Sequence, residues 1–156
     1  MKNYQRRIIG ILTLCGSSVG IVSSLTQLIE VNGVIGTMVF GLVLAIYSWG
    51  AWLGLNLLEN KPNFQQLIKF WWLQVPIFWS PLLGYFLTSG FHLSVYFDFS
   101  AIKLIWNFNL GSLFKFTLLQ SGHSWQLGVN IFALGVVWFL DKQVTSTKAV
   151  NVVASE

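Results

Sequence analysis

Two long runs without any charged residue dominate the first half of the chain, at residues 8–29 and 34–58. At about 1.5 Å per helical residue, each run is long enough to cross the roughly 30 Å of hydrocarbon in a bilayer. Only the short link around Glu30–Gly33 separates them. The pattern therefore predicts a pair of membrane-spanning helices joined by a tight external turn.

Two later apolar runs, residues 67–89 and 125–140, are less regular but still predict third and fourth spans. Pro76 and Pro81 each remove a backbone donor, so the third helix should kink or open locally. The fourth run has only sixteen residues, close to the lower limit for a span.

The segment between these runs, residues 90–124, alternates apolar and polar positions with a period of two, which is typical of strands. As a span it would carry Asp98, Lys103 and Lys115 into hydrocarbon, at about 2.5–3.5 kcal/mol each near the bilayer centre. We therefore expect a three-stranded β-meander outside the membrane, with an interfacial helix as the alternative.

The predicted fold is an all-α membrane domain: a four-transmembrane-helix bundle with a small external β-meander between helices 3 and 4. Residues 141–156 would form a cytoplasmic tail. Composition favours a membrane protein, since 54% of residues are hydrophobic and 9% are charged, against about 25% charged in soluble domains. A soluble domain of this size could not bury so much apolar surface, so the lipid bilayer is the first expected partner.

The basic residues predict the orientation. With four spans, seven of them fall on the side of both termini and two on the other, so the positive-inside rule predicts that both termini are cytoplasmic. We expect a bacterial inner membrane. The basic residues lie at segment ends and form no stripe, which argues against a nucleic-acid partner. The seven are Lys2, Arg6, Arg7, Lys61, Lys69, Lys142 and Lys148.

Small residues recur at four-residue spacing in the first two runs, a pattern that lets helix backbones approach closely in lipid. The pattern predicts helix packing, either within one subunit or between subunits. The residues concerned are Gly16, Gly20, Ser24, Gly50 and Gly54.

Four uncharged polar residues are candidates for intramembrane function: Asn56, Gln74, Ser80 and Asn130. Hydrogen bonds between helices are the simpler explanation for them. No acidic or basic residue lies deep in a predicted span, which counts against proton-coupled transport.

The sequence contains no catalytic motif, and we expect neither an enzyme nor a cofactor. Cys15 is the only cysteine, so an internal disulfide is excluded. His92 and His123, with Asp98, could supply three metal ligands, but their spacing follows no ligand pattern, and we expect no metal.

The apolar face of the external segment predicts self-association, because a small isolated sheet is marginal unless that face is covered. We expect a homo-oligomer, with a possible protein partner on either side of the membrane. The expected function is a polytopic membrane subunit serving as a sensor, anchor or scaffold. An oligomeric channel or passive permeation pathway, or a membrane-disrupting defence or toxin-type effector, is the alternative. The assembly face comprises Phe97, Trp106, Phe108 and Phe116.

Overall fold

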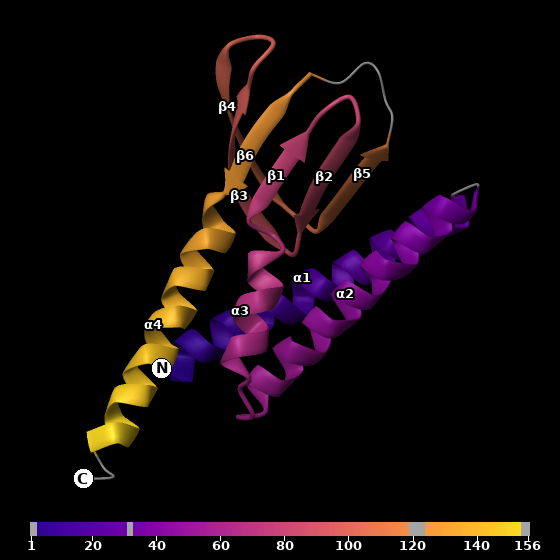
Figure 1. The fold of residues 1–156 in the computed structure, drawn as a ribbon. Coiled ribbons are helices and arrows are strands. Elements are labelled where there is room, and N and C mark those ends of the chain that lie inside the picture. Colours follow the sequence, from indigo (N-terminus) through magenta and orange to yellow (C-terminus); the bar gives the residue numbers. More distant parts are fainter. Residues whose placement is uncertain (1–2, 31–32, 119–123, 154–156) are drawn as a thin grey trace.

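The computed structural model describes residues 3–30, 33–118 and 124–153. These residues form two long helices, two further helices and one curled six-stranded sheet (Figure 1). The elements in chain order are α1 Asn3–Glu30, α2 Val34–Leu58, α3 Phe64–Trp72, β1 Pro76–Trp79, β2 Leu83–Thr88, β3 Phe91–Asp98, β4 Lys103–Leu110, β5 Leu113–Leu118, β6 Gln126–Asn130 and α4 Ile131–Val153.

The helices α1 and α2 form an antiparallel hairpin that lies along one side of the molecule (Figure 1). By length and composition, both are apolar enough to cross a membrane, as their uncharged runs predict. Gly33, with φ of 112°, precedes α2 in a backbone conformation that favours glycine.

The predicted four-helix bundle is wrong, and the third run shows why. Helix α3 ends at Trp72 after nine residues, and the chain then turns into the strands β1 and β2. Pro76 opens β1, where its missing N–H is tolerated, and it disfavours helix in the residue before it. Ser80 closes the turn next to Pro81, because its Oγ accepts hydrogen bonds from the N–H groups of Leu82 and Leu83.

The fourth run is also divided between strand and helix. After Trp125 the next five residues form β6, and α4 begins at Ile131. Asn130 makes this junction: its N–H donates to the Val75 carbonyl at 2.8 Å, and its Oδ1 accepts from the Ala133 N–H at 3.3 Å. The second bond caps the start of α4.

The sheet has the strand order β4-β3-β6-β1-β2-β5, and every neighbouring pair is antiparallel. Strands do form where the period of two predicts them, but the expected separate meander is wrong. Strand β5 pairs with β2 instead of β4, and β6 lies between β3 and β1. The predicted external segment is therefore part of a larger sheet that includes both later apolar runs.

Two apolar cores hold the molecule together. One lies where all four helices meet and contains Leu57, Phe70, Trp71 and Leu140, each at most 1% exposed. The other lies between α2 and the outer side of β2 and β5, around Val43, Tyr47, Leu87 and Phe114.

The turn between β2 and β3 packs against α1 at Gly16. A Cβ on Gly16 would lie 2.5 Å from the backbone nitrogen of Gly90, so only glycine lets the turn approach this closely. Ser112 donates its hydroxyl to the Gly16 carbonyl, and the Ser89 N–H donates to Gln74 Oε1 at 2.8 Å. Hydrogen bonds from polar side chains thus fix the position of the sheet against the helices.

Candidate ligand-binding pocket

The curl of the sheet separates its side chains into a concave polar face and a convex apolar face. The strand register shows which residues share the concave face, since directly paired residues point to the same side. Ser94 pairs with Asn107 and Asn130, Asp98 pairs with Gln126, and His92 pairs with Asn109.

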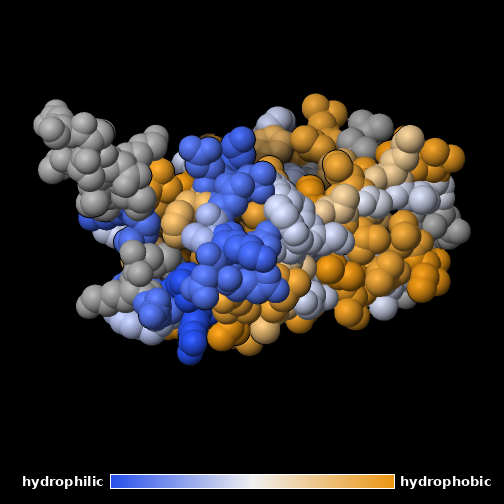
Figure 2. Space-filling view, turned by 90° about the horizontal axis from the view of Figure 1, so that it is seen from below, coloured by the Kyte–Doolittle hydropathy of each residue, from blue (hydrophilic) through white to orange (hydrophobic). Residues whose placement is uncertain are grey.

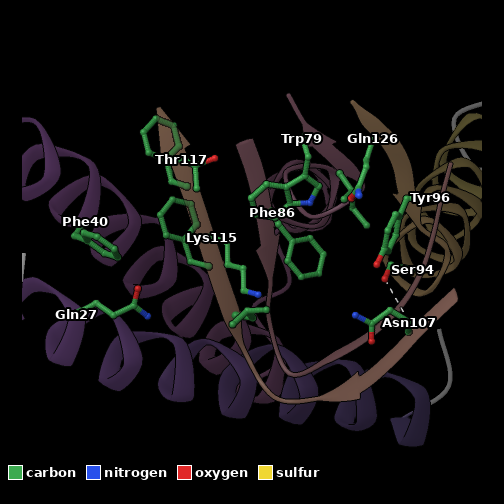
Figure 3. Close-up of a pocket in the computed structure, with 14 residues that line it drawn as sticks. Gln27, Phe40, Trp79, Phe86, Ser94, Tyr96, Asn107, Lys115, Thr117 and Gln126 are labelled. Carbon is green, nitrogen blue, oxygen red and sulfur yellow. Dashed lines mark hydrogen bonds between the residues drawn. The ribbon is translucent and has the colours of Figure 1, made fainter. Parts of the chain in front are cut away.

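A cavity of about 540 Å³ opens on the concave face and extends around the edge strand β5 toward α1 and α2. Residues from every strand contribute to its lining, together with Gln27 of α1 and Phe40 of α2 (Figure 3). The remaining lining residues are Ile77, Trp79, Phe86, Ser94, Tyr96, Asn107, Leu113, Phe114, Lys115, Phe116, Thr117 and Gln126.

Aromatic rings form part of the cavity wall because glycines lie beneath them. A Cβ on Gly84 would meet the Trp79 ring at 2.5 Å and Thr117 Oγ1 at 2.3 Å. A Cβ on Gly128 would lie 2.3 Å from the Cβ of Tyr96 and 2.5 Å from the Val95 carbonyl oxygen. The two glycines therefore leave room for Trp79 and Tyr96 on the neighbouring strands.

Lys115 is the single charged residue among those lining the cavity. It pairs with Phe86 in the register, and Figure 3 shows its side chain turned toward that ring, away from the helices. No acidic side chain forms an ion pair with it in the described part of the chain. The cavity lining therefore carries one positive charge and no negative one.

Several polar atoms on the concave face are buried without a partner among the described residues. They include Thr117 Oγ1, Asn130 Nδ2 and both ring nitrogens of His92. His92 is only 1% exposed and meets the edge of the Phe86 ring, with centroids 5.2 Å apart. Buried polar groups are normally hydrogen-bonded, and of these three residues Thr117 lines the cavity, where its hydroxyl could bond a ligand or water.

Asp98 organises the end of the cavity farthest from the helices. One carboxylate oxygen accepts from the N–H groups of Ser100 and Ala101, and the other accepts from Gln126 Nε2 at 2.8 Å and Ser124 Oγ at 3.1 Å. These hydrogen bonds, led by the one from Ala101, hold the pKa of Asp98 below its ordinary value. Asp98 thereby orients Gln126, which lines the cavity.

The polar residues predicted as intramembrane candidates lie outside this lining. Gln74, Ser80 and Asn130 make the structural hydrogen bonds described above, and Asn56 is half-buried near the end of α2.

The small residues contact several elements. Gly20 lies against the Tyr47 ring, Gly50 against the Phe70 ring, and Gly54 against Leu14. Gly16 receives the sheet, and Ser24 is 2% exposed.

The predicted assembly face is divided between two environments. Trp106 and Phe108 are 65% and 66% exposed, and Phe97 is 36% exposed. Phe116 instead stacks on Phe114 and packs toward α2, and it borders the cavity.

Most of the cavity was not predicted from the sequence, although the alternation of residues carried a signal for it. The alternation that marks the apolar face also marks a polar face, and Ser94, Asn107 and Lys115 follow it. Of the residues considered for a metal, His123 lies outside the described residues. Within the described part of the chain, no group of three or more metal-ligating side chains comes together.

The chain matches no family model, no curated protein sequence and no solved structure.

Proposed function

We propose that this protein is a non-enzymatic membrane subunit that senses or holds a small anionic amphiphile in the concave face of its sheet. The hairpin of α1 and α2 serves as its membrane anchor. One observation carries the proposal: a cavity of about 540 Å³ contains a single cationic side chain, Lys115, and no acidic lining residue.

The charge of the cavity favours an anionic group. Lys115 offers an ammonium, and the hydroxyls of Ser94 and Tyr96 and the amide of Asn107 lie on the same concave face. A carboxylate or phosphate bound there would gain charge-assisted hydrogen bonds, which are stronger than those between neutral groups. Thr117 is opposite Gly84 in the strand register, so its side chain lies on the same side of the sheet as Lys115. Its hydroxyl has no hydrogen-bond partner among the described residues.

The apolar lining favours a ligand with a hydrocarbon body. Ile77, Trp79 and Phe86 form a contiguous wall across β1 and β2. The volume lies within the range of small-molecule sites, about 300–1,000 Å³. A purely polar solute would leave this wall without complementary surface.

The proposal also includes the orientation of the protein in the membrane. Arg6, Arg7, Lys61 and Lys69 belong to the helical end of the molecule, where Figure 2 shows hydrophilic residues gathered. We propose that this end faces the cytoplasm of a bacterium, as the positive-inside rule expects.

Binding of decanoate, with decanol as the uncharged control, tests the proposal in zwitterionic lipid nanodiscs. We expect decanoate to raise the thermal midpoint of the wild type more than decanol does. Lys115→Met should lose this difference, because it keeps the length of the side chain and removes the charge. Lys103→Met is the matched control, since Lys103 is exposed and lies outside the cavity lining.

Two results would contradict the proposal. One is an equal effect of decanoate and decanol on the wild type. The other is an undiminished decanoate effect in Lys115→Met with the protein folded.

A further inference from the structure

The convex side of the sheet is apolar and uncovered over β4, β6 and the Asp98 end of β3, whereas α4 packs against the Phe91 end of β3. We call this surface the open face. Its residues are 36–78% exposed, while the polar side chains of the same strands point into the curl. Water-soluble sheets place their apolar face inward, whereas sheets that contact lipid place it outward. The open face consists of Phe97, Leu104, Trp106, Phe108, Leu110 and Leu127.

A second apolar surface belongs to the anchor helices. Ile29, Val34 and Met38 are 84%, 74% and 71% exposed near the turn between α1 and α2. Figure 2 shows hydrophobic surface spreading over the hairpin side of the molecule, with the hydrophilic residues gathered in a separate area. The sheet and the hairpin extend from the same core, so a bilayer that receives the hairpin also reaches the sheet (Figure 1).

The length of the last apolar run agrees with immersion of the sheet. Strand β6 runs directly into α4 without an intervening loop (Figure 1). Five strand residues extend about 17 Å, and the ten helical residues Ile131–Leu140 extend about 15 Å. Together they match the roughly 30 Å of hydrocarbon in a bilayer, although sixteen residues of helix alone would fall short.

Charges bracket this composite segment. Asp141 and Lys142 follow it at the helical end, and Asp98 and Lys103 lie at the opposite end, where β3 turns into β4. No charged residue lies in Gln126–Leu140 or elsewhere in the described strands β3, β4 and β6. In the other described strands the one charged residue is Lys115 of β5, which lines the cavity and does not belong to the open face. The surface that would contact lipid is therefore uncharged between two charged ends, as in a membrane-spanning unit.

We propose that lipid acyl chains cover the open face, so that β6 and the first half of α4 form one composite span and the sheet is immersed in the bilayer. The edge strands β4 and β5 both border the polar cavity. Water or ligand in the cavity can hydrate their unpaired backbone groups, which is the condition for non-helical backbone at membrane depth. This inference does not depend on the anionic ligand.

Spin labels at consecutive positions of β4 test it. In a Cys15→Ser background, the variants Trp106→Cys and Phe108→Cys place labels on the open face, and Asn107→Cys and Asn109→Cys place them on the concave face. Leu104→Cys is a further outward position if Trp106→Cys does not fold. In phosphatidylcholine vesicles, the collision rate of each spin label is measured with oxygen, which concentrates in lipid, and with a nickel chelate, which stays in water.

We expect the ratio of oxygen to nickel collisions to be several-fold higher at 106 and 108 than at 107 and 109. Nickel access at all four positions would overturn the proposal, because the sheet would then lie in water. Exclusion of both reagents at 106 and 108, with dipolar broadening between labels, would overturn it in favour of a second copy covering this face.

Discussion

The two ends of the sheet carry the same alternation of residues but have different neighbours on their convex side. At the β2–β5 end, Leu87 and Phe114 are 1% and 6% exposed because α2 packs against them. At the β3–β4 end, Leu104 and Phe108 are 54% and 66% exposed, although they are just as apolar.

In our proposal, one apolar face has two different neighbours, protein at one end and lipid at the other. Protein covers the β2–β5 end, where packing is specific and a missing atom leaves a cavity. The β3–β4 end meets a fluid surface in our account, and fluid lipid fills any space that a shortened side chain leaves. The stability cost of a substitution should therefore differ sharply between the two ends.

The largest effect is expected from the matched pair Leu87→Ala and Leu104→Ala. Leu87→Ala should destabilise the folded state by about 2–5 kcal/mol, the usual cost of a buried Leu→Ala change. Leu104→Ala should cost less than about 1 kcal/mol, as exposed substitutions do. Equilibrium unfolding in lipid nanodiscs measures both. Equal costs would show that protein also covers the β3–β4 end.

A smaller effect is expected at the covered end from removal of one hydroxyl. Tyr47 Oη donates to the Thr88 carbonyl at 2.8 Å, and this joins α2 to the end of β2. Tyr47→Phe should cost about 1 kcal/mol, the usual contribution of one hydrogen bond. The control is Tyr4→Phe, because Tyr4 is 57% exposed. An unchanged stability in Tyr47→Phe would show that this hydrogen bond does not stabilise the contact between α2 and the sheet.

The smallest effect concerns pH at the tip of β3. The pKa of Asp98 lies below its ordinary value of 3.8 in the folded protein, with the Ala101 N–H as the first cause. The carboxylate therefore stabilises the fold above the pKa of the unfolded chain, and this contribution is lost as pH falls through the lower folded pKa.

Asp98→Asn should thus lower the thermal midpoint at pH 7, with the difference from wild type shrinking on acidification. Thermal melts between pH 7 and pH 3 measure this. A constant difference at every pH would exclude the carboxylate as its source.

The sequence allowed some of these features to be predicted, and physical reasons explain the others. The hairpin helices follow from the length of two uncharged runs, and the strands around residues 92–116 follow from a period of two. Both signals depend on nearby residues alone. The run 67–89 is apolar throughout, so its pattern does not distinguish a helix from buried strands. Pro76 and Pro81 carried the signal, and the strand β1 begins at the first of them.

The sheet order and the cavity depend on contacts between distant residues. Gln126, Gly128 and Asn130 alternate with Leu127 and Val129, which is a strand pattern inside an apparent span. Strand β6 pairs with β1, about fifty residues away in the sequence, and with β3, about thirty residues away. No local pattern specifies these partners. Lys115 lies beside Phe86 in the cavity because β5 pairs with β2, and that pairing is not apparent in the sequence.

The depth of Ile131 in the bilayer shows whether the sheet is immersed. Ile131 begins α4 at the junction with β6, and it is 38% exposed, so a fluorophore on Ile131→Cys in a Cys15→Ser background is accessible to lipid. Quenching by lipids with nitroxides at different depths locates it, with Lys142→Cys as the reference for the headgroup region. If the sheet is immersed, nitroxides deep on the acyl chain quench residue 131 most strongly. Strongest quenching by headgroup nitroxides would place the start of α4 at the membrane surface and the sheet outside the bilayer, which would contradict the account.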